Sequence, residues 1–265
     1  MSECIDGYII TIMDNASSRQ AADQCIRSIW STGSHIDASL FRATWPETAI
    51  TDIQKYLSRY KKQFLNADDT PRWTYPLIGE GIDMRTGLHL KAYRAADIRK
   101  VVSCSISHMR LWAKCVDHDR PIMILEHDAV FKNKFHWKKV RTNTLKIADA
   151  TRSPSDLEFT KGILGINAPF GATRKASNYH NGIIKTGVQP VPVVDGPLEP
   201  PMPSGLAGNS AYIIYPHAAK ALLEKTAEIG IWPNDALMCR QFFPWLYQHY
   251  PYFTGLTPVQ STTTR

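Results

Sequence analysis

The sequence of 265 residues lacks the features that mark secreted and membrane-spanning proteins. It has five cysteines, an odd number, and no Cys-x-x-Cys pair, so we expect neither a disulfide framework nor a cysteine-rich zinc site. No apolar run approaches the roughly 20 residues that span a bilayer, and the acidic N-terminus has no apolar signal-peptide segment. We therefore expect a soluble protein of a reducing, cytoplasmic compartment.

Charged residues are also few, at 21% of the chain, which is too low for a disordered protein, whereas the 43% of hydrophobic residues can form a sizeable core. The 31 Lys and Arg outnumber the 24 Asp and Glu, which gives a formal net charge of +7. A basic surplus favours anionic partners such as nucleoside diphosphates, nucleic acid or acidic glycans, although it also serves solubility alone. Because we find no internal repeat, we expect one domain over residues 1–265.

The hydrophobic pattern predicts an α/β fold that opens with a strand, a helix and a second strand, as a parallel sheet does. Short apolar or alternating runs predict strands at residues 7–13, 36–40, 121–125, 162–166 and 211–215. Helical spacing predicts helices at residues 18–30, 51–64, 102–116 and 216–230.

Two stretches are rich in loop-forming residues. After the charged helical piece, a segment with Pro, Gly and Trp runs through Trp73 and Tyr75. Long loops inside compact domains are often functional, and we interpret this one as an excursion over the cleft. Residues 171–203 are rich in Gly, Pro, Asn and Lys and predict a second long surface loop.

The segment with the most chemical content follows the predicted strand at residues 121–125, where the apolar run stops at Glu126, His127 and Asp128. In open α/β sheets, ligands bind beyond the carboxyl ends of the strands. Carboxylate oxygens there suit Mg²⁺ or Mn²⁺, which keep substrate phosphates in their coordination shell. On the pattern alone, a turn after a core strand remains the simpler interpretation, because Glu-x-Asp is a very common sequence.

A second motif precedes this strand by one helix. Its residues are Cys104, Ser107, His108, Leu111 and Trp112. Together with the strand that ends at Glu126, they resemble glycosyltransferase family 25, the group of lipooligosaccharide and collagen galactosyltransferases. That family has a small residue and a cysteine, then Ser-His, then Leu-Trp, and later an apolar strand ending in Glu-Asp-Asp. His127 departs from the family's aspartate, which leaves the detailed coordination open.

Other segments resemble the same family in the same order. The first strand and the turn with Arg19 are similar to its N-terminal strand and arginine-bearing loop. Residues 208–214 and 218–223 are similar to its glycine- and tyrosine-bearing strand and the following helix. Residues 233–235 stand where the family has a proline and an aspartate. The resemblance covers most of the chain.

The resemblance implies a GT-A type fold, with a mostly parallel central sheet flanked by helices and long loops over the cleft. It also implies inverting transfer from a UDP-sugar, with Mn²⁺ or Mg²⁺ as the cofactor. Asp128 is then the main metal ligand, and Glu126 holds the donor ribose or a metal-bound water. The residues assigned to donor binding are Thr11, Asp14, Arg19, Ser107, His108, Glu126 and His127.

Inverting transfer requires a base near the attacking hydroxyl. Asp235 is the candidate, because it follows a helix at the expected end of the fold. An equal alternative is that Asp235 caps a helix at residues 236–242. The role of His108 is similarly open: it either contacts the donor or is a buried histidine hydrogen-bonded to the backbone. Arg19 either binds a phosphate or is a solvated helix residue.

For the acceptor, the amino-acid sequences of residues 73–77, 125–130 and 250–251 are similar to those of small bacteriophage members of the family. Phage glycosyltransferases of this size decorate hydroxymethylated bases in DNA. We therefore predict hydroxymethylated cytosine in double-stranded phage DNA as the acceptor, in the bacterial host cytoplasm, with the target base extruded from the duplex. Residues predicted to contact the acceptor or its phosphates are Trp73, Tyr75, Thr263 and Arg265. For the segment around Trp73, a lid over the donor is the preferred alternative.

Two other functions stay open. One is a saccharide glycosyltransferase of lipopolysaccharide or cell-surface glycan synthesis, and the other is a non-catalytic nucleic-acid-binding protein on a transferase fold. A steep salt dependence of DNA binding would separate the saccharide enzyme from the other two. Metal-dependent donor binding would separate both enzymes from the non-catalytic protein. The identity of the sugar, hexose or pentose, and the oligomeric state are left open.

Overall fold

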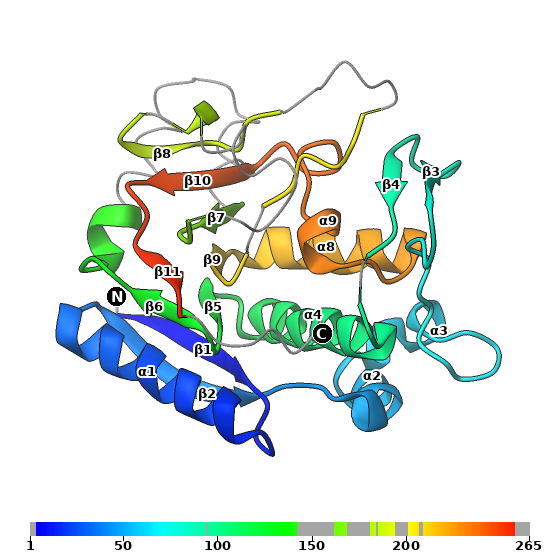
Figure 1. Ribbon diagram of the computed structural model, residues 1–265, viewed down its shortest axis with the longest axis horizontal. Helices are drawn as coiled ribbons and strands as arrows, with labels where there is room; N and C mark the ends of the chain where they lie inside the picture. The colour runs from blue at the N-terminus through cyan, green and yellow to red at the C-terminus, as the bar shows by residue number, and fades with distance from the viewer. Residues whose placement is uncertain are drawn as a thin grey trace.

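In this computed structural model the described residues are 4–93, 95–141, 162–168, 181–183, 185–193, 201–206 and 209–257. A seven-stranded sheet in the order β2-β1-β5-β9-β7-β10-β8 forms the centre of this part of the chain (Figure 1). Its strands are β1 (Ile5–Thr11), β2 (Ile36–Arg42), β5 (Ile122–Glu126), β7 (Ile163–Gly165), β8 (Gly187–Pro190), β9 (Ala211–Ile214) and β10 (Leu246–Tyr250).

The sheet is mixed in direction. β1 runs parallel to β2 and β5, and β7 runs parallel to β10. The pairs β5–β9, β7–β9 and β8–β10 are antiparallel, so three of the six pairings are parallel. The predicted α/β class with a large helix-flanked sheet is confirmed. The sheet is less parallel than the family resemblance implies, because β9 runs antiparallel to both of its neighbours and β8 runs antiparallel to β10.

Helices cover both faces of this sheet. They are α1 (Ala16–Thr32), α2 (Ala49–Tyr56), α3 (Lys61–Phe64), α4 (Ile98–His118), α8 (Pro216–Ile229) and α9 (Asn234–Leu237), with short 3-10 turns η1 (Pro46–Thr48) and η2 (Ser58–Tyr60). Two small antiparallel pairs join β3 (Glu80–Ile82) to β4 (His89–Lys91) and β6 (Ala129–Phe131) to the distant β11 (Thr254–Leu256). α4 and α8 lie side by side on one face, and α1 lies on the other (Figure 1).

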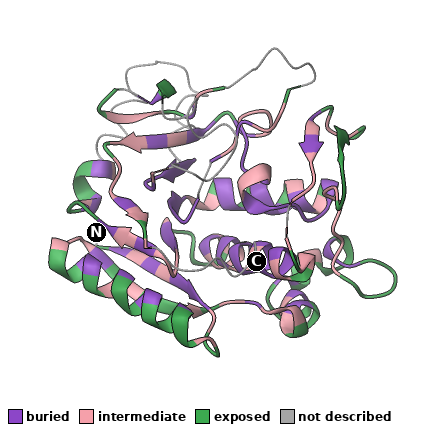
Figure 2. Ribbon diagram, in the orientation of Figure 1, coloured by how far each residue is buried: buried purple, intermediate pink, exposed green. Residues whose placement is uncertain are grey.

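The alternation of side chains along β5 divides the core into two layers. Ile122 and Ile124 pack in the cluster that includes α4 and α8, whereas Met123 and Leu125 pack in the cluster that includes α1. Figure 2 shows this strand and the inner face of α4 buried, while the outer face of α1 is exposed. Because successive residues of a strand point to opposite faces, the next residue, Glu126, points to the α4 side.

The helix boundaries follow local capping chemistry. The Asn15 side chain accepts a hydrogen bond from the Ser18 backbone N–H at the start of α1, and Gly33, with φ of +63°, ends that helix. Pro216 occupies the first turn of α8, and Gly230 follows its end, as the sequence predicts.

Two sequence expectations require correction. The predicted helix at residues 51–64 is broken into α2, η2 and α3. The predicted loop at residues 171–203 contains β8, which pairs with β10 at the edge of the main sheet. A four-residue edge strand carries too little apolar pattern to be recognised among prolines and glycines. Of the described helices, none has the length and apolar character needed to cross a membrane.

Candidate active site at the end of β5

The site begins where β5 ends. Glu126 is the last residue of the strand, and its backbone N–H donates to the Ser210 carbonyl at 2.7 Å. The parallel neighbour β1 places Ile10 opposite Glu126 in the register, so both strands leave the sheet at the same edge. The site therefore lies beyond the carboxyl ends of two parallel strands, where ligands bind in open α/β sheets.

The Glu126 carboxylate contacts a buried histidine of α4. Glu126 Oε1 lies 3.3 Å from His108 Nε2, and His108 Nδ1 lies 2.9 Å from Tyr212 Oη. The same hydroxyl accepts the Trp112 Nε1–H at 2.9 Å. Burial raises the pKa of Glu126, but the hydrogen bond from His108 and the favourable electrostatic interaction with the nearby His108 and His127 rings outweigh burial, so the pKa lies below its ordinary value. Glu126 is therefore ionised at neutral pH.

The donors and acceptors of this network fix the histidine tautomer. Trp112 can only donate, so the Tyr212 hydroxyl accepts from it and donates its own proton to His108 Nδ1. His108 then carries its proton on Nε2 and donates it to Glu126. This arrangement satisfies every polar atom of a network whose tryptophan, tyrosine and histidine are at most 1% exposed. The network holds the carboxylate in one orientation.

Asp128 lies in the turn between β5 and β6. Its backbone carbonyl accepts from the Thr257 N–H at 2.9 Å, which anchors the turn. Its Oδ1 atom is buried and has no hydrogen-bond partner among the described residues. Burial raises the pKa of Asp128 to about 7, and the charge of Glu126 adds to the rise. A buried carboxylate oxygen without a partner is costly unless a proton or a cation satisfies it.

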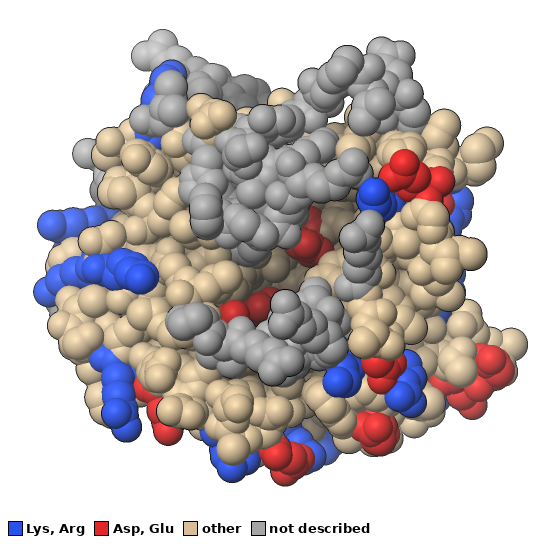
Figure 3. Space-filling model, viewed as in Figure 1, with Lys and Arg blue, Asp and Glu red and all other residues tan. Residues whose placement is uncertain are grey.

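Two further ionisable side chains lie within electrostatic reach of Glu126, namely His127 and Asp235. Burial lowers the pKa of His127, with a partial offset from Glu126 and from a backbone hydrogen bond at Ile10, so its ring is neutral at pH 7. Burial raises the pKa of Asp235 to about 6, and the charge of Glu126 contributes. Glu126 thus lies within electrostatic reach of both Asp128 and Asp235, and acidic side chains appear in the hollow of the face in Figure 3.

Asp235 belongs to the first turn of α9, and the N-cap of that helix is Pro233. The alternative of an Asp235 cap for a helix at residues 236–242 is therefore corrected, because the observed helix starts two residues earlier, at Asn234, and ends at Leu237. α9 contacts α4, the helix that carries His108.

Of the predicted aromatic residues, Tyr75 lies within electrostatic reach of Asp235, and the segment is anchored to Trp232, just before α9. The rings of Trp73 and Tyr75 are 6.2 Å apart, and the Tyr75 ring is 5.4 Å from that of Trp232. The Trp232 Nε1–H donates to Thr74 Oγ1 at 3.0 Å. Burial raises the pKa of Tyr75, and the charge of Asp235 adds to it. This segment therefore forms a fixed wall beside Asp235.

The other predicted donor residues occupy the same edge with different exposure. Thr11 is buried and its hydroxyl donates to the Ile9 carbonyl at 2.9 Å, whereas the Asp14 side chain is 92% exposed. The Arg19 side chain contacts the Met13 carbonyl.

Ser107 serves a structural purpose. Its hydroxyl donates to the Ser103 carbonyl at 2.9 Å and accepts the Thr44 N–H at 2.8 Å, which joins α4 to the segment after β2. Two predicted acceptor contacts, Thr263 and Arg265, lie outside the described residues.

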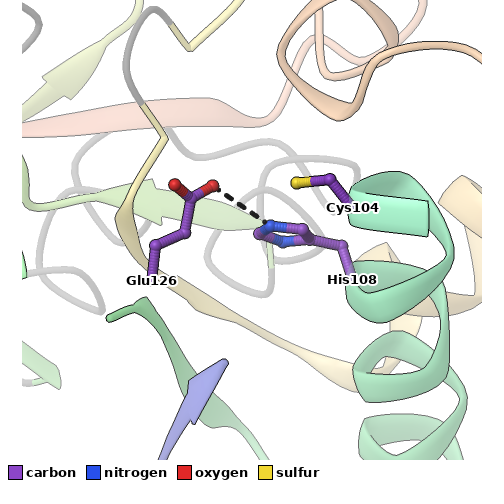
Figure 4. A group of neighbouring side chains, drawn as sticks. All are labelled: Cys104, His108 and Glu126. Atoms are coloured by element: carbon purple, nitrogen blue, oxygen red, sulfur yellow. Dashed lines mark hydrogen bonds and ion pairs between the residues drawn. The ribbon is translucent and has the colours of Figure 1, made fainter. Parts of the chain in front are cut away.

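Two further members of the site are Tyr212 and Cys104. The Cys104 thiol lies one helical turn before His108 and faces the same carboxylate (Figure 4). Burial raises the pKa of this thiol, followed by the charges of Glu126, Asp235 and Asp128. The i,i+4 spacing of the cysteine and the histidine was a usable sequence signal. For Tyr212 no such signal exists, because it lies 104 residues from its histidine partner.

Comparison with known proteins agrees with this geometry. Residues 83–238, more than half of the chain, match glycosyltransferase family 25, described as LPS biosynthesis protein. No curated protein matches the sequence significantly. The crystal structure of mouse xyloside xylosyltransferase 1 in its apo form is similar at 10% identity over 93% of this chain and 84% of that chain, with a TM-score of 0.41, too distant to carry an argument. The family match includes Cys104, His108, Glu126, Asp128 and Asp235, so the chain belongs to glycosyltransferase family 25 and is a glycosyltransferase.

Proposed function

We propose that this glycosyltransferase uses a UDP-sugar donor and binds a divalent cation, Mn²⁺ or Mg²⁺, at Asp128 and Glu126. One observation carries the proposal: the Asp128 Oδ1 atom is buried without a partner beside the ionised Glu126. A hard cation is the partner that such oxygens prefer, and its charge would lower the raised pKa of Asp128. The residues present therefore fit the ion that the family resemblance implies.

The chain's own groups would act on the donor in distinct ways. When bound, the cation neutralises charge on the departing diphosphate. The neutral ring of His127 offers either a lone pair or an N–H to the same region. His108, fixed by Tyr212, holds the Glu126 carboxylate in place. Thr11 ends β1, and Asp14 and Arg19 follow it at the same edge of the sheet; these three residues are our candidates for further donor contacts.

Asp235 is proposed as the general base of an inverting transfer. Its carboxylate accepts the proton of the acceptor hydroxyl while that oxygen forms a bond to the anomeric carbon. The bond from this carbon to the UDP oxygen breaks, and UDP leaves with the electron pair. A pKa of about 6 suits the role, because the carboxylate is mostly ionised at pH 7 and still basic enough to accept a proton.

Donor binding tests the metal assignment most simply. Calorimetric titration of UDP into the protein should show binding that requires Mn²⁺, and Asp128→Asn should weaken it strongly. Asp117→Asn, at an exposed aspartate of α4, is the matched control and should bind as the parent does. Equal metal-dependent UDP affinity in Asp128→Asn and the parent would refute the assignment.

As the acceptor we propose hydroxymethylated cytosine in double-stranded DNA. Two features support this proposal: the net positive charge of the chain, and the similarity of the sequence of residues 73–77 to bacteriophage members of the family. Trp73 and Tyr75 would then stack on an extruded base or its neighbour, with contacts to phosphates from Thr263 and Arg265. The rigid packing of Tyr75 on Trp232 equally suits a wall over the donor.

A saccharide acceptor is the second candidate, favoured by the description of the family as LPS biosynthesis protein. Incubation of enzyme, Mn²⁺ and a pool of nucleotide sugars with hydroxymethylcytosine DNA in one arm and lipooligosaccharide in the other separates the two by mass spectrometry. A hexose or pentose mass added to the nucleoside supports DNA, and a gain confined to the saccharide arm rejects it. The non-catalytic alternative is set aside, because the chain belongs to a family of transferases.

A further inference from the structure

Three potential metal ligands converge in front of α4. Cys104 and His108 are one helical turn apart on the same face of α4, and Glu126 faces them from the end of β5 (Figure 4). The cysteine sulfur, a histidine nitrogen and a carboxylate oxygen lie within 4.8 Å of one another. His108 is fully buried, whereas the other two are partly exposed, so the cluster opens on one side.

The distances match a tetrahedral zinc site closely. With ordinary zinc–ligand bond lengths, a histidine nitrogen and a carboxylate oxygen on one Zn²⁺ are about 3.4 Å apart. His108 Nε2 and Glu126 Oε1 are 3.3 Å apart before any ion is bound. The corresponding sulfur separations are about 3.6 Å. Because the ligand atoms lie within 4.8 Å of one another, the Cys104 thiol has to approach by at most about 1.2 Å. One side-chain rotation of a partly exposed cysteine supplies such a movement.

We propose that Cys104, His108 and Glu126 form a binding site for a thiophilic divalent cation of the Zn²⁺ type, distinct from the hard-cation site at Asp128. A thiolate and an imidazole are the ligands that select zinc over Mg²⁺ or Mn²⁺. Three protein ligands leave the fourth tetrahedral position to water. The buried Tyr212 hydroxyl contacts His108 and is itself held by Trp112, so it fixes the ring in orientation as outer-shell groups do in zinc proteins.

Proton balance sets the strength of the site. Binding releases one proton, that of the Cys104 thiol. The ring proton of His108 moves from Nε2 to Nδ1, where it is donated to the Tyr212 hydroxyl, whose two lone pairs accept from His108 and Trp112. The hydroxyl proton of Tyr212 loses its acceptor in this exchange, which weakens binding. The site therefore suits reversible occupancy better than a permanent structural ion.

Because Glu126 belongs to both sites, occupancy by Zn²⁺ should lower Mn²⁺-dependent binding of the donor. This consequence rests on the proposed function, whereas zinc binding itself does not. The experiment is chosen to separate the two.

The test uses Co²⁺ as a spectroscopic substitute for Zn²⁺ in the purified full chain. Titration of metal-free protein with Co²⁺ should produce a sulfur-to-cobalt charge-transfer band that saturates near one equivalent and disappears on addition of Zn²⁺ but not of Mg²⁺. Cys104→Ser should weaken Co²⁺ binding by at least about 100-fold, since even outer-shell changes cost 10–100-fold. The matched control is Cys115→Ser, at a buried cysteine of the same helix whose thiol contacts backbone carbonyls, and it should keep the band.

A second measurement needs no variant. Zn²⁺ should protect Cys104 of the parent protein from iodoacetamide, as read by peptide mass spectrometry, while the exposed Cys4 reacts equally with and without zinc. No cobalt band in the parent, a band that survives in Cys104→Ser, or alkylation of Cys104 that ignores Zn²⁺ would each overturn the proposal. A band without any Mn²⁺-dependent UDP binding would instead reject the proposed function and leave the zinc site standing.

Discussion

Removal of one atom, the hydroxyl oxygen of Tyr212, tests the buried hydrogen-bond network of the site. Tyr212→Phe keeps the ring and removes the group that lies 2.9 Å from both Trp112 Nε1 and His108 Nδ1. All three side chains are at most 1% exposed, so water has no access to replace the hydroxyl. Each buried polar group left unpaired costs about 1–3 kcal/mol, which gives a loss of about 2–6 kcal/mol in the free energy of unfolding.

Urea unfolding followed by circular dichroism measures this loss, provided that the denaturant slope is the same in both proteins. Tyr8→Phe, at a half-buried tyrosine of β1, is the control and should change stability by less than about 0.5 kcal/mol. A loss below about 1 kcal/mol in Tyr212→Phe with an unchanged slope would refute the reasoning, because it would mean that the hydroxyl satisfies neither neighbour.

Three further predictions follow from single residues. If Asp235 is the base, kcat/KM should fall as the pH drops through about 6 and reach a plateau above it, because only the ionised carboxylate accepts a proton; a flat profile between pH 5 and 7 would contradict the role. Because the pKa of Asp128 is raised to about 7, the stability that its neutral carboxyl contributes is present below the ordinary aspartate pKa and is lost as the pH rises through 7. Metal-free Asp128→Asn should therefore melt at a higher temperature than the parent protein at pH 8. An equal or lower melting temperature would count against a buried, unpaired carboxylate at this position. Gly230→Ala should destabilise by about 1–3 kcal/mol, because φ is +100° and the new Cβ would lie 2.4 Å from Thr74 Cγ2. Gly79→Ala, with φ of +68° and nothing within 4 Å, should cost clearly less, and equal losses in thermal unfolding would remove the clash as the cause.

The sequence predicted the parts of the fold that depend on local pattern. The strand before Glu126 is a continuous apolar run that is buried on both faces, which is why the strand, its end and the carboxylates beyond it could all be read from the sequence. α4 and α8 were similarly visible, because one face of each is regularly apolar and Pro216 and Gly230 mark the ends of the second.

The direction of the strands could not be predicted from the same signal. β9 is fully buried and β5 is buried and apolar as far as Leu125, and a strand buried on both faces looks alike in sequence whether its neighbour is parallel or antiparallel. The edge strand β8 was missed because strand pairing, not hydrophobic pattern, holds it to β10.

The chemistry of the site divides in the same way. Glu126 and Asp128 were found because two carboxylates follow a buried strand. Glu126 interacts electrostatically with Asp235 and contacts His108. Both interactions depend on the face of β5 from which the Glu126 side chain projects and on the packing of α4 against α9. Such contacts between distant segments are set by tertiary packing, and only the family resemblance indicated Asp235.

The measurement that tests the central claim most directly is anomalous diffraction at the manganese edge from crystals grown with UDP and Mn²⁺. We expect an anomalous peak next to the Asp128 carboxylate, with the UDP diphosphate beside it and no such peak in Asp128→Asn crystals. A peak that persists without the Asp128 carboxylate, or that lies at Cys104 and His108 instead, would contradict the assignment of the cation to the end of β5.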